Sequence, residues 1–168
     1  VSLKTKTLER SFAADHSLPY LMLDLDSFFL DDFYDDLNLD EDFDVGLCRR
    51  IKPLGINGTG PNGCAYIGSF FIANNKYPKK AMAFMNRWMD IMKLGGRLKE
   101  TPSLCRLISG YRIGWQRQED FKPDPLTGFK IKEYKEEIFA CYKGYDPERT
   151  KILHFKSFGG TAAFNNPN

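Results

Sequence analysis

Residues 20–30, YLMLDLDSFFL, are the stretch from which a fold can be argued. Their apolar side chains follow one another almost without interruption, a pattern typical of central parallel strands that are buried on both faces. Asp24 and Asp26 interrupt the run, and two residues that lie two apart in a strand point to the same side. We therefore expect a buried strand that delivers two carboxylates to one place.

The chemistry of this pair leaves two interpretations open. Two like charges so close together repel each other, and burial increases the cost. A divalent cation between Asp24 and Asp26 would relieve the repulsion, and oxygen ligands suit Mg²⁺ or Mn²⁺. Alternatively, both carboxylates face the solvent at the end of a strand. The local sequence alone does not decide between these two interpretations.

The rest of the chain predicts strands that alternate with helices. Apolar composition predicts further strands, and helical spacing or turn residues predict helices and loops. The expected strands are 45–50, 65–73 and 151–155, and the expected helices are 3–14, 78–94 and 103–109. We expect a short helix and a loop over 31–44, and loops over 53–63 and 114–130. Four methionines, Met82, Met85, Met89 and Met92, form one apolar stripe that we interpret as core packing. We expect an α/β layered domain that spans residues 1–168.

The charges are distributed unevenly, although the net charge is only +2. Between Ser11 and Cys48 the chain has no Lys or Arg and eleven acidic residues, whereas the remainder is predominantly basic. One interpretation is a solvated acidic loop beside an ordinary basic surface. The other is that the acidic residues recruit a cation and the basic ones a phosphate-bearing partner. Nucleic acid is not expected as a partner, because the basic residues are dispersed.

Membrane and disulfide signals are weak in this sequence. No apolar run approaches the roughly 18 residues that a bilayer span needs, and residues 1–10 lack the apolar stretch of a signal peptide. The four cysteines, Cys48, Cys64, Cys105 and Cys141, form no CxxC pair. We interpret them as small buried hydrophobes, and we expect a cytoplasmic location.

Three families place a DxD sequence after an apolar strand. Haloacid-dehalogenase-like phosphatases use DxDx(T/S), but Phe28 occupies the place where a Thr is usual. Translesion polymerases have a DxDxFF-like strand, which Asp24–Phe29 resembles, but they require a basic nucleic-acid surface, and here acidic residues follow. The third family comprises the nucleotide-sugar glycosyltransferases.

The order of motifs resembles that of GT-A fold glycosyltransferases. PYLMLDLDSFFLDDFYDDL (19–37) is similar to their strand with the DxD motif and the short helix that follows. DVGLCRR (44–50) and CAYIGSFFIANN (64–75) resemble the next two strands, and PKKAMAFMNRWMDIM (78–92) resembles the helix after them. KILHFKSFGG (151–160) is similar to the terminal segment of family-eight-type enzymes, without its KPW ending.

This resemblance implies a fold, a site and ligands. The fold would be a partial GT-A fold, a mixed central sheet flanked by helices, because only about 20 residues precede Asp24. The implied Mn²⁺ (or Mg²⁺) ligands are Asp24, Asp26 and His154. Asp24 would also contact the ribose, and Lys156, Gly159 and Gly160 would approach the phosphate oxygens of a UDP-sugar or another nucleotide-diphosphate sugar. The catalytic nucleophile or base is left unassigned.

The function implied is transfer of a sugar from a nucleotide-diphosphate sugar to a glycan or another hydroxyl acceptor. The alternatives are a non-catalytic, truncated glycosyltransferase-like domain that acts in binding or assembly, and a haloacid-dehalogenase-like phosphatase. An incomplete sheet would expose an edge strand, so we also expect a possible homo-oligomer.

Overall fold

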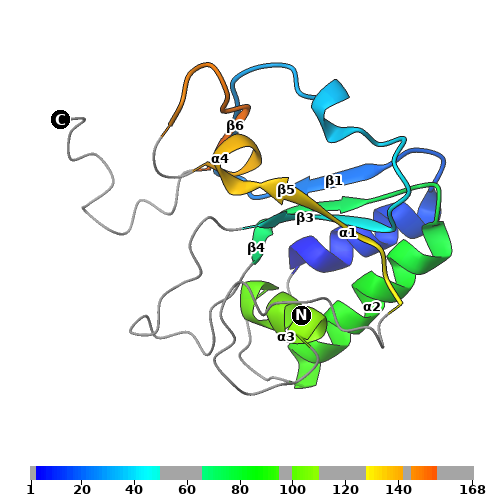
Figure 1. Cartoon of the computed structure of the whole chain (residues 1–168). Helices are drawn as coiled ribbons and strands as arrows, with labels where there is room; N and C mark the ends of the chain where they lie inside the picture. The colour runs from blue at the N-terminus through cyan, green and yellow to red at the C-terminus, as the bar shows by residue number, and fades with distance from the viewer. Residues whose placement is uncertain (1–2, 50–65, 95–99, 110–127, 142–144, 155–168) are drawn as a thin grey trace.

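A mixed four-stranded sheet organises the molecule. The computed structural model describes residues 3–49, 66–94, 100–109, 128–141 and 145–154. The strands lie in the order β1 (Tyr20–Leu23), β4 (Tyr66–Ala73), β3 (Val45–Arg49) and β5 (Ile131–Lys135) (Figure 1). β4 runs antiparallel to both of its neighbours, whereas β3 and β5 are parallel. This confirms the α/β class and the mixed sheet with its flanking helices.

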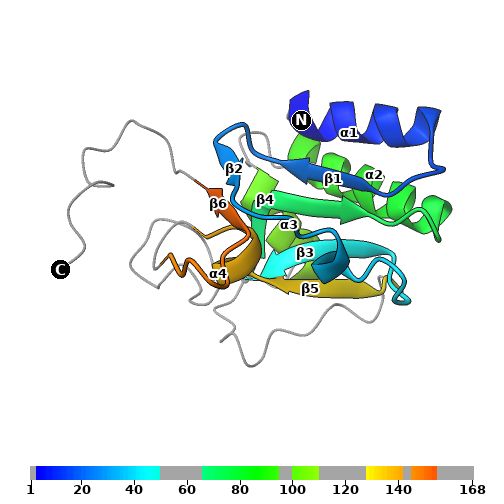
Figure 2. The same cartoon turned by 90° about the horizontal axis from the view of Figure 1, so that it is seen from above.

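Three helices cover one face of this sheet. They are α1 (Leu3–Ala14), α2 (Pro78–Leu94) and α3 (Glu100–Ser109), and Figures 1 and 2 show α1 and α2 running alongside the strands. A proline suits the first turn of α2, because the N–H that it lacks has no intrahelical partner there. Met85, Trp88 and Met92 recur at helical spacing, and all three are buried. The predicted methionine stripe is therefore core packing.

β4 separates two hydrophobic cores. All eight of its residues are buried, and the consecutive side chains of Phe70 and Phe71 point to opposite faces of the sheet. Phe71 packs with the helices in the first core, where its ring lies 5.5 Å from that of Trp88. Phe70 faces the second core, with its ring 5.7 Å from that of Phe139. β4 is thus buried on both faces, as is most of β3.

A smaller layer covers the other face. It contains the two-stranded antiparallel sheet of β2 (Ser27–Phe29) and β6 (Ile152–His154), together with the one-turn helix α4 (Glu136–Phe139) and the 3₁₀ turn η1 (Asp35–Leu37). In Figure 1 this layer lies on the opposite side of the sheet from α2 and α3. Ile152 and Phe139 are buried in the second core, which fixes the layer on the sheet.

The expectation that residues 20–30 form one central parallel strand is wrong. The stretch is divided into β1 and β2, and β1 is an antiparallel strand at the edge of the sheet. Only Met22 of β1 is buried, and Asp24 and Asp26 lie in the connection between the two strands. The physical reason is that unpaired carboxylates are costly to bury, so the charged part of the run stays at the surface.

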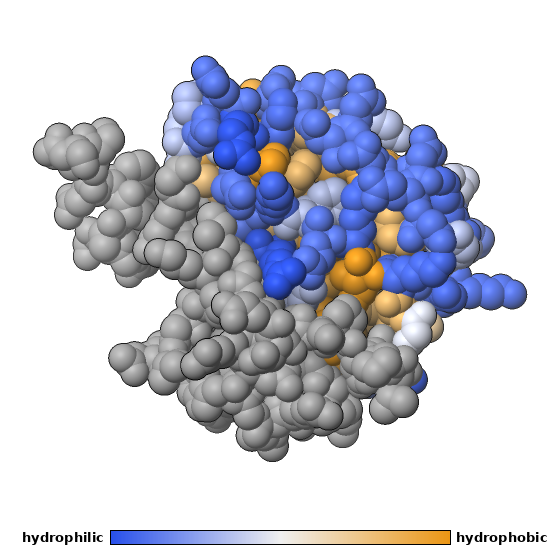
Figure 3. Space-filling model, in the orientation of Figure 1, coloured by the Kyte–Doolittle hydropathy of each residue, from blue (hydrophilic) through white to orange (hydrophobic). Residues whose placement is uncertain are grey.

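The acidic segment, residues 31–44, is bound to the rest of the chain through lysines. Lys151 Nζ lies 2.5 Å from Asp31 Oδ2 and 3.8 Å from Asp36 Oδ2. The other ion pairs join Lys76 to Asp40, Lys132 to Glu41, Lys130 to Asp42 and Lys80 to Asp44. Figure 3 shows a largely hydrophilic surface where this segment lies. A short helical turn, η1, and loops make up the segment, as expected.

Several further expectations can be compared with the structure. Cys48 and Cys141 are buried, as the sequence predicted for its cysteines. In the part of the chain that the structure describes, no helix is long and apolar enough to cross a bilayer. The predicted loop at 53–63, and most of that at 114–130, lie outside the described residues.

Candidate metal centre

The connection between β1 and β2 places two carboxylates side by side. It contains three residues, and it is closed by a hydrogen bond from the Ser27 N–H to the Asp24 carbonyl oxygen, 3.1 Å long. Leu25 projects fully into solvent between the two aspartates. Asp24 and Asp26 keep about a third of their side-chain area exposed. The pair is therefore accessible to solvent, although most of its side-chain area is buried.

A histidine from the far end of the described chain completes the group. β6 pairs with β2 so that His154 lies opposite Ser27. The His154 backbone N–H donates to the Cys141 carbonyl oxygen at 2.7 Å, which fixes the position of the histidine on a second side. The side chain is 9% exposed. The buried face of the site is thus an imidazole held by backbone hydrogen bonds.

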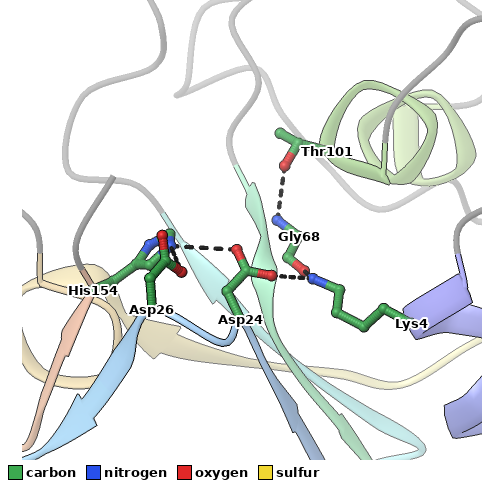
Figure 4. A network of polar contacts seen from close by, with 6 residues as sticks. All are labelled: Lys4, Asp24, Asp26, Gly68, Thr101 and His154. Atoms are coloured by element: carbon green, nitrogen blue, oxygen red, sulfur yellow. Dashed lines mark hydrogen bonds and ion pairs between the residues drawn. The ribbon is translucent and has the colours of Figure 1, made fainter. Parts of the chain in front are cut away.

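The three side chains converge on one point. His154 Nε2 lies 3.3 Å from Asp24 Oδ2 and 3.2 Å from Asp26 Oδ1. One possible ligand atom from each residue lies within 4.8 Å of the other two. Figure 4 shows that the imidazole and the two carboxylates face one another. A single ion at this point can bind to all three side chains.

A lysine that was not predicted lies on the other side of Asp24. Lys4 Nζ, from α1, contacts Asp24 Oδ1 and donates a hydrogen bond of 3.0 Å to the Gly68 carbonyl oxygen (Figure 4). Asp24 thus presents one oxygen to the lysine and the other to the histidine. The first oxygen is fixed by an ion pair, and the second remains directed at the centre of the group.

The anchor of Lys4 is itself fixed by a close approach of β4 and α3. The Gly68 N–H donates to Thr101 Oγ1 at 2.9 Å. A Cβ on Gly68 would lie 3.0 Å from Glu100 Cβ and 3.2 Å from the backbone nitrogen of Thr101. That is tighter than ordinary van der Waals contact, so glycine is required if the first turn of α3 is to lie this close.

Electrostatics keep Asp24 ionised. Its partial burial alone would raise the pKa, because burial disfavours the charged form. The hydrogen bonds and charges of His154 and Lys4 act in the opposite direction and prevail, so the pKa of Asp24 lies below its ordinary value. An ionised carboxylate is the form that a metal ion requires.

The donor set is suited to a divalent metal. Two carboxylates and one imidazole are available, and carboxylates are ligands of Mg²⁺ and Mn²⁺. Mg²⁺ prefers a site of oxygens and waters, so the imidazole favours Mn²⁺ of the two. Three protein ligands leave further positions of a six-coordinate ion for water or a substrate. The residues present therefore fit the ion that the sequence suggested.

The structure brings together some of the predicted site residues and says nothing of others. Asp24, Asp26 and His154 form the cluster, whereas Lys156, Gly159 and Gly160 lie outside the described residues. Lys4, Gly68 and Thr101 were not foreseen. A pattern for Lys4 did exist: it precedes the buried Leu8 and Phe12 by four and eight residues, which places a charge on the buried face of α1.

Comparisons with known proteins add no relatives. Scans of protein-family models, of curated protein sequences and of solved structures give no significant match to this chain. Any functional conclusion therefore depends on the site itself.

Proposed function

We propose that this chain is a metal-dependent glycosyltransferase domain with a partial GT-A fold. It would transfer a sugar from a nucleotide-diphosphate sugar to a glycan or another hydroxyl acceptor, with Mn²⁺ (or Mg²⁺) as its cofactor. The observation that carries the proposal is the convergence of Asp24, Asp26 and His154. These are the three residues to which the motif resemblance assigns the metal.

The convergence supports the proposal because proximity in the sequence does not by itself bring all three residues together. Asp24 and Asp26 are neighbours in the chain, but His154 reaches them only through the pairing of β2 with β6. A surface pair of carboxylates needs no buried imidazole directed at both of its members. Such an imidazole within hydrogen-bonding reach of two carboxylates is what a three-ligand metal site needs.

Each residue has a separate role in the proposed chemistry. Asp26 and His154 would be direct ligands. Asp24 would contact the metal, toward which its Oδ2 is directed, and also the ribose of the donor. The ion supplies Lewis-acid stabilisation of the diphosphate as negative charge develops on it. Lys156 and the Gly159–Gly160 backbone would add contacts to the phosphates. About a third of the side-chain area of each aspartate is exposed, and the donor would approach from that side.

Isothermal titration calorimetry with Mn²⁺ and UDP tests this function. We expect the wild type to bind Mn²⁺, and to bind UDP only when Mn²⁺ is present. Asp26→Ala should lose both binding events because it removes a direct ligand. Asp42→Ala, which removes an exposed carboxylate of the acidic segment, is the matched control and should retain both.

This titration, together with two activity assays, separates the alternatives. Absence of heat with the wild type, or equal heat with Asp26→Ala, would exclude the metal site and the proposed function. Binding of Mn²⁺ and UDP without release of UDP from any UDP-sugar, in the presence of acceptors, would identify a non-catalytic binding domain. Hydrolysis of p-nitrophenyl phosphate that is abolished by Asp24→Asn would instead identify a phosphatase.

A further inference from the structure

Lys4 belongs to the candidate metal centre without being a possible metal ligand. Its ammonium group contacts Asp24 Oδ1 and lies 3.0 Å from the Gly68 carbonyl oxygen. The side chain is 23% exposed, so the group lies at the boundary between the core and the solvent. Among the described residues, the ion pairs of Asp24 and Asp26 involve only Lys4 and His154.

The net charge of the group is positive when a divalent ion is bound. With the imidazole in the neutral form that a metal ligand requires, two carboxylates and one ammonium group carry a net charge of −1 before the ion is counted. A divalent cation bound by the same residues makes the net charge +1. Without Lys4, the metal-bound site would only be neutral. Lys4 therefore makes a metal-bound site attractive to anions.

We propose that Lys4 couples the metal to an anionic ligand, so that the two bind cooperatively. This inference rests on the proposed function, because it requires a metal at Asp24, Asp26 and His154. Lys4 weakens the binding of the metal alone through repulsion between the two cations. A phosphate-bearing anion that contacts both cations relieves this repulsion, and it therefore binds tightly only when the metal is present.

The contacts of Lys4 explain how it remains available to the anion. An ammonium group has three N–H donors, and the described contacts use two of them, to Asp24 and to Gly68. The third can be donated to a ligand. If Asp24 binds a metal, the hydrogen bond to the Gly68 carbonyl oxygen still holds the Lys4 ammonium group in place. That carbonyl is in turn fixed through the hydrogen bond from the Gly68 N–H to Thr101.

The chemical class of the anion follows from the two cations. A metal ion bound at Asp24 Oδ2 and the Lys4 ammonium group at Asp24 Oδ1 would be adjacent but separate positive charges. A diphosphate carries several oxygens on two phosphorus atoms, so it can contact the metal and the lysine at the same time. Lysine is a common phosphate-binding residue that acts as a point charge. Inorganic pyrophosphate is therefore a suitable probe.

The test compares two affinities in the full chain. Calorimetry measures Mn²⁺ binding to the protein alone, and then pyrophosphate binding at saturating Mn²⁺ against a blank of the same Mn²⁺ buffer. For Lys4→Met we expect Mn²⁺ to bind about tenfold more tightly, because a nearby positive charge is removed. Pyrophosphate should bind about tenfold more weakly, because one of its two cationic contacts is lost.

Three further variants control for charge and folding. Lys4→Arg retains the charge and should behave as the wild type. Lys6→Met, on the exposed side of the same helix, should also leave both affinities unchanged. Lys4→Gln retains a donor for the Gly68 carbonyl, and it should reproduce the opposite changes of Lys4→Met even if the methionine variant folds poorly.

The outcomes distinguish this inference from the proposed function. If the wild type binds no Mn²⁺, the proposed function fails and the coupling fails with it. If the wild type binds Mn²⁺ but both affinities fall together in Lys4→Gln, Lys4 only positions Asp24, and the coupling is wrong. Unchanged affinities in that variant would also overturn it. Opposite changes are expected from the charge effect and not from a general loss of structure.

Discussion

Two acidic regions of this molecule satisfy their charges in different ways. In the acidic segment (31–44), ion pairs join six carboxylates to five lysines from other parts of the chain, and among the described residues no three of these carboxylates come together as a metal site. In the candidate metal centre, two carboxylates converge on one imidazole, and a single lysine contacts one of them. The ion pairs of the first region are spread over five lysines, whereas the second region directs two carboxylates at one imidazole and has one lysine.

This difference indicates which acidic residues are candidates for chemistry. A surface carboxylate with its own lysine contributes little to stability, and its role is to hold a loop in place. Converging carboxylates that lack sufficient counter-charge cost stability unless a cation binds. The acidic composition of the sequence is most conspicuous at 31–44, but the site lies at Asp24 and Asp26, outside that segment.

Loss of His154 from the candidate metal centre should produce the largest change in Mn²⁺ affinity. We expect His154→Ala to lower Mn²⁺ affinity by more than about 100-fold, because changes outside the direct ligands already cost 10- to 100-fold. The only other histidine, His16, is exposed, so His16→Ala is a matched control that should leave the affinity unchanged. Calorimetry measures both. Equal affinities in the two variants would show that His154 is no ligand.

Thermal stabilisation by the metal should depend on the carboxylates of the candidate metal centre and not on those of the acidic segment. At a free Mn²⁺ concentration 100 times Kd, binding stabilises the folded state by about 2.7 kcal/mol. For a chain of this length that raises Tm by roughly 5–10 °C. Asp26→Asn should abolish the increase, whereas Asp42→Asn should retain it. Scanning calorimetry with Mn²⁺ and with EDTA provides the measurement, and an increase that persists in Asp26→Asn would contradict the site.

In the absence of metal, neutralising one carboxylate should have opposite effects in the two regions. Asp26→Asn relieves repulsion with Asp24, and its amide oxygen still accepts a hydrogen bond from His154, so we expect stabilisation of about 0.5 kcal/mol. Asp36→Asn loses its pairing with Lys151, so we expect a small decrease in stability. Urea unfolding in EDTA measures both. Destabilisation by Asp26→Asn would show that the centre is already balanced without a metal.

The smallest expected effect concerns pH and the acidic segment. Hydrogen bonds from Lys151 and from the Asp32 backbone lower the pKa of Asp31, and hydrogen bonds from Lys130 and Tyr77 lower that of Asp42. A pKa lowered by folding gives stability that is present above the unfolded-state value, about 4, and is lost as the pH falls through the folded-state value. Tm should therefore decrease below about pH 4.

The control for this pH effect is Lys151→Met, which removes the partner of Asp31. Its curve of Tm against pH should be flatter than that of the wild type between about pH 5 and 3. At neutral pH its Tm should differ by only about 1 °C, because exposed ion pairs contribute little. An unchanged curve would show that this pair makes no contribution to folding.

Much of the fold could be predicted because its patterns are local. The helical spacing of α2 and the apolar composition of β4 and β3 require no knowledge of their partners. The error at residues 20–30 arose because burial on both faces depends on which strands flank a segment. Pairing is a long-range property, and only the topology shows that β1 has one neighbour among the strands that the structure describes. A charge pair within the run was the local indication against a central strand.

The candidate site was predicted in part for a similar reason. The spacing of Asp24 and Asp26 indicated a carboxylate pair, but His154 entered only through its resemblance to a known motif. Lys4 was missed because a single lysine among 24 basic residues stands out only when the buried face of its helix is known. The contact through Gly68 and Thr101 depends on how closely α3 approaches β4, which no sequence pattern encodes.

The short pairing of β2 with β6 has a consequence for the kinetics of the site. Among the described residues three residue pairs join these strands, and a two-stranded sheet is marginally stable by itself. Brief opening of the pair would separate His154 from Asp24 and Asp26, so ion release can be limited by this opening. A bound ion would then suppress it, and amide hydrogen exchange in β2 and β6 should slow when Mn²⁺ is added, while exchange in β4 stays unchanged.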